Sequence, residues 1–169
     1  MIELSESKTI QIIEGWDIEE KAILNCVGKY GTPLLIASRE IIRRNYKRLK
    51  DCLPQVEIFY AVKANHHLKI IKILQELGSN LDVSSLGELE MALSSGFDPS
   101  QLIYTRPIKD EDELIILKKY GIKPLVFDNE NELRKISVHY PHCEVVLRIK
   151  IENPYCLINL SEKFGCEIN

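Results

Sequence analysis

Short apolar runs alternate along this chain with longer segments in which apolar residues recur at helical spacing. Runs of the length expected for buried strands lie at 34–37, 57–63, 81–85, 102–105, 125–127 and 144–149. Between two of these runs, Leu68, Ile71 and Leu74 recur as they do on one face of a helix. Repeated strand–helix units of this kind predict a parallel sheet with helices outside it.

Turn-forming residues mark the ends of these elements. Ser38 is a candidate cap for the helix that follows the first run, and Gly78 and Gly121 are expected to end helices. Residues 1–30 form a separate amino-terminal segment in this interpretation, with a β-like stretch at 9–13 and a helix from Ile18 to Tyr30 that Asp17 could cap. Residues 31–169 carry the repeating pattern.

The run Phe59–Asn65 contains a lysine in an unusual setting. Strand alternation places Phe59, Ala61 and Lys63 on one face. An ammonium on an apolar face is costly unless it is paired, deprotonated or covalently used, and the small Ala61 leaves room for a flat group. This layout is typical of a lysine held in a Schiff base with a carbonyl cofactor. The alternative is a strand-end lysine that reaches water.

Two further charged residues interrupt apolar strands. Asp82 alternates with Leu81 and Val83, so it lies on the opposite face, where it could pair with Lys63. It could instead cap the next helix. Arg148 is either inward and paired or exposed at a strand end. His139, His142 and Cys143 are close together, but no second ligand cluster at zinc-like spacing accompanies them, and no metal site is predicted.

Composition limits the classes of function. The chain has 169 residues, of which 45% are hydrophobic and 28% charged, as expected for a folded protein. Its 22 basic and 25 acidic residues give a net charge of -3, which offers no electrostatic case for nucleic acid. No signal-like or membrane-length apolar stretch occurs, and five cysteines lack a C-x-x-C pair. We therefore expect a cytoplasmic protein with reduced thiols and no membrane partner.

Several motifs agree in order with one known family. Phe59–Asn65 is followed by Leu77–Ser85 with Gly87–Glu90, then by Leu147–Ile149, and finally by Ser161–Cys166. Together they resemble the pyridoxal-phosphate decarboxylases of ornithine, lysine, arginine and diaminopimelate, which share an alanine-racemase-like fold. The last motif (S-x-K-F-G) and the turn Phe127–Glu130 resemble the ornithine/lysine branch most closely.

The resemblance implies a fold and a site. The fold is a (β/α) TIM-type barrel, of which this chain supplies about five of the eight strands when the lysine strand is counted as the first. The implied cofactor is pyridoxal 5'-phosphate, with Lys63 as its covalent and catalytic partner and Ala61, Asp82 and Arg148 as further cofactor-binding residues. Lys163 matches a residue near the dimer interface beside the active site, and the full-length protein is expected to be a homodimer.

The later parts of the family's sequence have no candidate positions here. These are a histidine that stacks on the cofactor ring, a glycine-rich phosphate loop, a carboxylate for the pyridine nitrogen and a carboxy-terminal β-domain. We therefore expect an amino-terminal portion that is inactive alone and, with an open barrel, aggregated, partnered or swapped. The segment Thr105–Lys109 departs from the commonest family pattern.

Three functions remain open on this basis. The first is decarboxylation of a basic amino acid, with ornithine favoured, to give putrescine and carbon dioxide in polyamine synthesis. The second is a non-catalytic decarboxylase homologue that regulates polyamine synthesis by binding. The third is a small single-barrel cofactor carrier, which the S-x-K-F-G motif does not suit.

Overall fold

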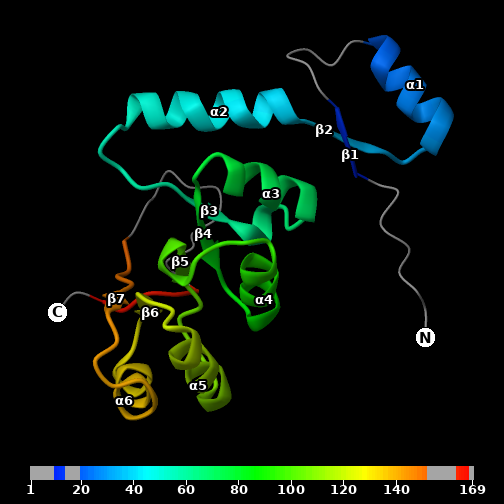
Figure 1. The fold of residues 1–169 in the computed structure, drawn as a ribbon. Coiled ribbons are helices and arrows are strands. Elements are labelled where there is room, and N and C mark those ends of the chain that lie inside the picture. The colour runs from blue at the N-terminus through cyan, green and yellow to red at the C-terminus, as the bar shows by residue number, and fades with distance from the viewer. Residues whose placement is uncertain (1–9, 14–19, 152–162, 168–169) are drawn as a thin grey trace, which may run out of the picture. The chain divides into compact units, whose positions relative to one another are not determined.

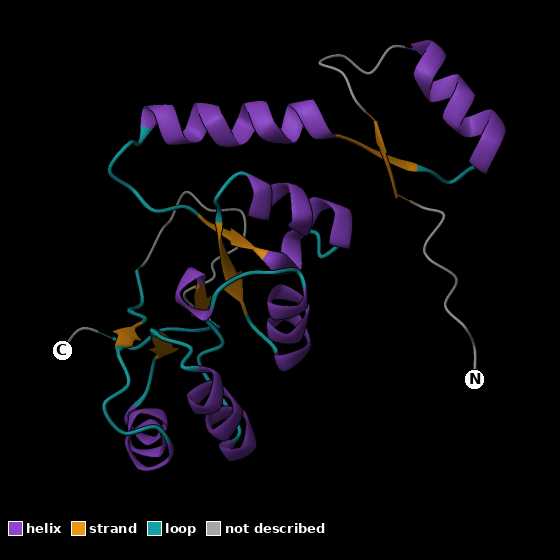
Figure 2. Ribbon diagram, in the orientation of Figure 1, coloured by secondary structure: helices purple, strands orange, loops and turns teal. Residues whose placement is uncertain are grey.

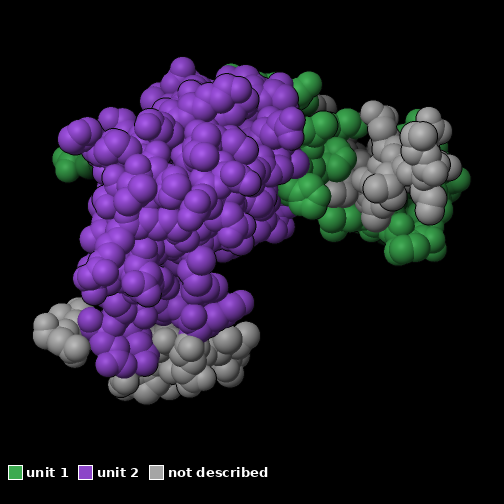
Figure 3. Space-filling model, turned by 90° about the horizontal axis from the view of Figure 1, so that it is seen from below, with its two compact units in different colours: residues 1–58, 66–78 green, residues 59–65, 79–169 purple. Residues whose placement is uncertain are grey.

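The computed structural model describes residues 10–13, 20–151 and 163–167 (Figure 1). The chain forms two compact units, one of residues 1–58 and 66–78 and the other of residues 59–65 and 79–169 (Figure 3). Helices predominate in the first unit, and a sheet flanked by helices forms the second (Figure 2). Since all of the predicted site residues belong to the second unit, its architecture decides their positions.

The described residues of the first unit form a two-stranded parallel sheet and three helices. The strands are β1 (Ile10–Ile13) and β2 (Leu35–Ser38), and the helices are α1 (Glu20–Tyr30), α2 (Arg39–Cys52) and α3 (Leu68–Glu76). The predicted cap of α2 is confirmed, because Ser38 Oγ accepts a hydrogen bond of 3.3 Å from the Ile41 amide. The proposed cap at Asp17 lies outside the described residues.

The second unit is built on a five-stranded parallel sheet whose strands follow chain order. The strands are β3 (Phe59–Ala61), β4 (Asn80–Val83), β5 (Leu102–Tyr104), β6 (Leu125–Phe127) and β7 (Val145–Leu147). The 3₁₀ turns η1 (Val62–Ala64) and η2 (Pro99–Gln101) and the helices α4 (Leu86–Ser94), α5 (Glu111–Tyr120) and α6 (Glu130–His139) lie between them. Sequential parallel strands with helical connections confirm the predicted barrel type and its five strands.

The two faces of this sheet differ in burial. Leu81 and Val83 of β4 are fully buried, as are Leu102 and Tyr104 of β5, whereas Asp82 between the first pair is only half-buried. The same strand alternation that was expected from the sequence therefore exists. The helices contribute fully or nearly fully buried side chains to the core of this unit, namely Leu89, Leu114, Leu117 and Ile136. Burial of each such side chain stabilises the fold by about 1.5–3 kcal/mol.

Strand β7 is the most exposed strand of the sheet. Val145, Val146 and Leu147 have exposed fractions of 38, 43 and 47%. Just beyond β7, the backbone of Ile149 forms a parallel bridge with Cys166. The Cys166 amide donates to the Arg148 carbonyl at 3.0 Å, and the Lys150 amide donates to the Cys166 carbonyl at 2.8 Å. Residues 163–167 thus extend the pairing beyond this edge. In the described part of the chain, no helix combines the length and apolar character of a membrane span.

Candidate active site

The predicted site residues gather at one edge of the five-stranded sheet. Parallel strands place their carboxyl ends at a common edge, which is where barrels of this type carry their sites. Lys63 follows β3 at this edge, Thr105 follows β5, Asp128 follows β6 and Arg148 follows β7. Asp82 lies in the carboxyl-terminal half of β4. The topology thus brings together residues that are far apart in sequence.

Lys63 lies in a turn and not in the strand that the sequence predicted. β3 ends at Ala61, and η1 carries Lys63 with Val62 buried and Lys63 exposed. The prediction that Lys63 continues the face of Phe59 and Ala61 is therefore wrong beyond Ala61. The cause is the turn itself, which the hydroxyl of Tyr60 bridges by donating to the Asn65 carbonyl at 3.2 Å. The turn leaves the amine accessible at the sheet edge, as attack on an aldehyde requires.

Asp82 lies beside the strand that leads to Lys63. In the sheet register it pairs with Ala61 on β3 and Ile103 on β5. Its Oδ1 accepts a hydrogen bond of 2.5 Å from the Thr105 hydroxyl. Burial raises the pKa of the Asp82 carboxyl above 3.8, and Glu88 adds to this rise, while the bond from Thr105 and the charge of Lys63 oppose it. The positive charge of Lys63 thus acts on the Asp82 carboxyl, although no hydrogen bond or ion pair joins the two within the described residues.

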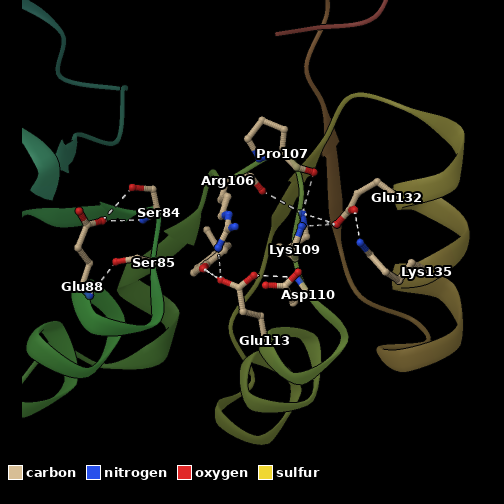
Figure 4. Close-up of polar contacts among 11 residues, drawn as sticks. Ser84, Ser85, Glu88, Arg106, Pro107, Lys109, Asp110, Glu113, Glu132 and Lys135 are labelled. Carbon is tan, nitrogen blue, oxygen red and sulfur yellow. Dashed lines mark hydrogen bonds and ion pairs between the residues drawn. The ribbon is translucent and has the colours of Figure 1, made fainter. Parts of the chain in front are cut away.

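The alternative role of Asp82 as a helix cap is excluded by α4. Ser85 caps this helix, since its Oγ accepts from the Glu88 amide at 3.2 Å. The Glu88 carboxylate in turn accepts from the amide and hydroxyl of Ser84 at 2.7 and 3.1 Å (Figure 4). These bonds satisfy the start of the helix without Asp82, which leaves its carboxylate available to the site.

Arg148 is held against the described part of the S-x-K-F-G motif. Its guanidinium carbon lies 4.8 Å from the centre of the Phe164 ring, and the ammonium of Lys163 lies 5.2 Å from the same ring. The Arg148 amide also donates to the Phe127 carbonyl at 2.8 Å. Phe164 was not identified as a site residue from the sequence. Within the described residues, no hydrogen bond or ion pair joins Arg148 to Lys63 or Asp82.

Gly165 fixes this motif at the sheet edge. Its amide donates to the Asp128 carboxylate at 3.1 Å, and its φ of 101° is a conformation that favours glycine. A Cβ at this position would lie 2.9 Å from the carbonyl carbon of Ile149, closer than carbon atoms tolerate. The glycine therefore allows the motif to approach the backbone that carries Arg148. Ser161, the first residue of the motif, lies outside the described residues.

A buried lysine supports the loop between β5 and α5. Lys109 is fully buried, and its Nζ donates to the carbonyl oxygens of Arg106, Pro107 and Val126 at 3.0, 3.2 and 2.7 Å. It also forms an ion pair of 3.0 Å with Glu132 (Figure 4). Burial lowers the pKa of Lys109, and Glu132 opposes this effect. This role was not predicted from the sequence, because an isolated lysine before a helix has the pattern of a surface residue.

Glu113 anchors the other side of the same loop. Its carboxylate accepts from the Tyr104 hydroxyl at 2.6 Å, from Arg106 at 2.8 Å and from the Asp110 amide at 2.8 Å. Burial, with the bond to Glu113, raises the pKa of Tyr104 above its usual range. The two buried carboxylates, Glu113 and Glu132, therefore hold the segment that follows Thr105 from both sides.

The negative charge of Asp82 should lower the free energy of unfolding at neutral pH. Its folded-state pKa is raised, so the fold binds this proton more tightly than the unfolded chain. The stability that depends on this proton is complete below the unfolded pKa of about 3.9 and is lost as the pH rises through the folded value. We expect Asp82→Asn to raise the melting temperature at pH 7. The increase in the free energy of unfolding should be less than about 1 kcal/mol, because the site is partly solvated.

Thermal unfolding of both proteins across the pH range measures this effect. The gain from Asp82→Asn should vanish in acid, where the wild-type carboxyl is protonated. Asp112→Asn is the control, because Asp112 lies in the first turn of α5, where a negative charge is favourable. A stabilising effect of equal size in the control would contradict the assignment of the cost to Asp82.

Five parallel strands in chain order, with helices between them, define a (β/α) barrel architecture that carries polar side chains at its carboxyl edge. The family model described as "Pyridoxal-dependent decarboxylase, pyridoxal binding domain" matches residues 21–169. The chain therefore belongs to the pyridoxal-dependent decarboxylase family. This result confirms the predicted family and the pyridoxal cofactor at the level of the family.

Individual relatives agree with this assignment. The lysine/ornithine decarboxylase of Selenomonas ruminantium is 34% identical over 156 residues, which are 92% of this chain and 40% of that protein. Antizyme inhibitor 2 of Xenopus laevis is 37% identical over 129 residues, or 76% of this chain and 28% of that protein. The crystal structure of SrLDC in complex with PLP and cadaverine matches with a TM-score of 0.78 and 33% identity, covering 91% of this chain and 38% of that one. The chain spans 40% or less of the length of each.

Proposed function

We propose that this chain is the amino-terminal, cofactor-binding portion of a decarboxylase that acts on a basic amino acid. The favoured reaction is the conversion of ornithine to putrescine and carbon dioxide. The observation that carries the proposal is the position of Lys63 and Asp82 at the same carboxyl edge of a parallel sheet, where Asp82 pairs with Ala61, two residues before Lys63. Its family relatives include a protein named as a lysine/ornithine decarboxylase, which supports the substrate class.

The residues present fit a cofactor that carries an aldehyde and an anionic group. Lys63 offers an exposed amine in a fixed turn, and Ala61 beside Asp82 presents only a methyl group. Asp82 provides a carboxylate at the same sheet edge, beside the strand that leads to Lys63. Arg148 supplies a permanent positive charge at the same edge, oriented by Phe164. When bound, pyridoxal phosphate supplies an electron sink for the charge that develops at the substrate α-carbon.

Each residue has a distinct task in this proposal. Lys63 is the catalytic residue that attaches the aldehyde, and its exposure at the edge lets it exchange the cofactor with the amine of a substrate. Asp82 holds the proton at the Lys63 nitrogen. Ala61 leaves space beside it, and Arg148 binds and orients an anionic group. We assign Lys163 to the neighbourhood of the site, near a dimer interface of the whole protein.

The wider organisation is part of the same proposal. Residues 1–30 form an amino-terminal segment and residues 31–169 form the first part of the barrel, with the remaining strands and a β-domain contributed elsewhere. We place the whole protein in the cytoplasm as a homodimer. The chain's share of the length of these two relatives, 40% and 28%, supports the view that further residues complete the site.

A non-catalytic regulatory role is the second candidate. The likeness to antizyme inhibitor 2 favours it. Against it, Lys63, Asp82 and Arg148 are all present, and a protein that only binds a partner has no need of an amine and a carboxylate at the same sheet edge.

Cofactor attachment and product formation separate the two candidates. The purified chain is incubated with pyridoxal phosphate, reduced with borohydride and mapped by peptide mass spectrometry. We expect one adduct, at Lys63. Release of labelled carbon dioxide from ornithine, lysine and arginine is then measured for this chain alone and in mixture with the remainder of a relative's barrel and its β-domain. Diffuse labelling of several lysines, with no adduct favoured at Lys63, would overturn the proposed cofactor site.

A further inference from the structure

Thr105 makes the one side-chain hydrogen bond to Asp82 found among the described residues. The residue follows β5 directly, and its hydroxyl donates to Oδ1 of Asp82 on the neighbouring strand at 2.5 Å. A hydrogen bond of this length between a hydroxyl and a carboxylate is of the strong, charge-assisted kind. In the described part of the chain, Oδ2 of Asp82 accepts no hydrogen bond. This oxygen is therefore available for Lys63.

The backbone around Thr105 is held on both sides. Its amide donates to the Val83 carbonyl at 3.0 Å, which continues the pairing between β4 and β5. The next residues are fixed through their carbonyl oxygens by the buried Nζ of Lys109, at 3.0 Å to Arg106 and 3.2 Å to Pro107. The loop is thus built so that the hydroxyl stays within reach of Asp82, and the bond does not depend on a freely moving side chain.

Asp82 needs such a donor because its surroundings oppose its charge. Burial and the carboxylate of Glu88 on α4 both favour the neutral form, whereas Lys63 on η1 and the hydroxyl of Thr105 favour the ionised form. These are the charged and hydrogen-bonding groups that act on Asp82 from the neighbouring elements. Glu88 is itself bound to Ser84, so it stays in place.

We propose that Thr105 is a positioning residue of the cofactor site, whose hydroxyl holds one oxygen of Asp82 in place and leaves the second oxygen available for Lys63. This inference rests on the proposed function, in which Asp82 holds the proton at the Lys63 nitrogen. It goes further by assigning a task to Thr105, which acts on the lysine through Asp82. A merely structural Thr105 would contribute to stability alone.

The test compares Thr105→Val, which removes the hydroxyl at nearly constant shape, with Thr105→Ser, which keeps it. Aspartate carboxyls are labelled with ¹³C in cofactor-free protein and titrated by NMR, with Asp82→Asn used for assignment. We expect the Asp82 midpoint to rise by about one pH unit in Thr105→Val and to return to the wild-type value in Thr105→Ser. In parallel, the cofactor adduct on Lys63 is measured after borohydride reduction at a series of pH values. The pH below which the yield of this adduct falls should rise by the same amount in Thr105→Val.

The outcomes separate the two proposals. If wild-type protein forms the Lys63 adduct and Thr105→Val leaves both the Asp82 titration and the adduct profile unchanged, the role of Thr105 is overturned. If wild-type protein forms no adduct on Lys63 at any pH, the proposed function fails, and the role of Thr105 in that site fails with it. Should Thr105→Val unfold, Thr105→Ala gives the same comparison with the serine variant.

Discussion

Replacing Lys63 with alanine is expected to abolish reductive attachment of pyridoxal phosphate to the chain. No other residue in the described part of the chain combines an amine at the sheet edge with the carboxylate of Asp82. The stability of the fold should change by no more than about 0.5 kcal/mol, because Lys63 is exposed and makes no hydrogen bond or ion pair within the described residues. Attachment is measured as moles of reduced adduct per mole of chain, and stability by thermal unfolding.

The same variant has a second expected result. Lys63 is one of the two groups that hold the Asp82 pKa down, so its loss should raise the Asp82 titration midpoint further. Lys72→Ala, at an exposed lysine of α3, is the matched control and should keep both the adduct and the titration. Retention of a near-stoichiometric adduct in Lys63→Ala would show that another amine is the cofactor's partner.

The alternation of strands and helices was predictable from the sequence, because each element has a strong local signal. Each signal extends over a few residues: the apolar run at Leu81–Val83, and the serines Ser38 and Ser85 that cap helices. These local preferences agree with the tertiary packing, so they are retained in the fold. The end of β3 was less predictable. Val62 continues the apolar run, yet its side chain is buried from within a 3₁₀ turn, and only the tertiary structure distinguishes the two cases.

The polar network behind the site could not be predicted from one sequence. Glu113 and Glu132 stand in the first turns of α5 and α6, where acidic residues are expected for helix electrostatics alone. Their burial results from the loop that folds over them. Glu113 binds Arg106, seven positions away, and Glu132 binds Lys109, 23 positions away. The stacking of Arg148 on Phe164 is likewise a long-range contact, and it explains why the two motifs occur together.

Lys109 is where this unpredicted network should matter most for stability. Lys109→Met is expected to lower the free energy of unfolding by about 3 kcal/mol or more, which corresponds to a fall of roughly 10 °C in the melting temperature. Three carbonyl oxygens lose this donor in the variant. Among the described residues, the Glu132 carboxylate then keeps Lys135, at 2.7 Å, as its one ion-pair partner. A methionine fills the same space but donates no hydrogen bond.

The matched control is Lys123→Met, because Lys123 also forms a lysine–glutamate ion pair, of 2.8 Å with Glu144, but in water. The two side chains of that pair are 52 and 65% exposed, against 0 and 2% for Lys109 and Glu132. Exposed pairs contribute about 0–1 kcal/mol, so the control should unfold close to the wild-type temperature. Equal losses in the two variants would contradict the view that burial makes the Lys109 contacts important.

A double variant separates the charge from the hydrogen bonds. Glu132→Gln keeps an oxygen that can accept from the Lys109 amide, a bond of 3.1 Å in the wild type, but removes the buried negative charge. Combined with Lys109→Met, Glu132→Gln should recover part of the lost stability, because no uncompensated carboxylate remains. The rest should stay lost, because the carbonyls of Arg106, Pro107 and Val126 still lack the lysine donor. The loss in unfolding free energy that remains in the double variant measures how much the lysine contributes by holding the loop that begins at Thr105. We expect the Asp82 titration midpoint to rise in the same double variant.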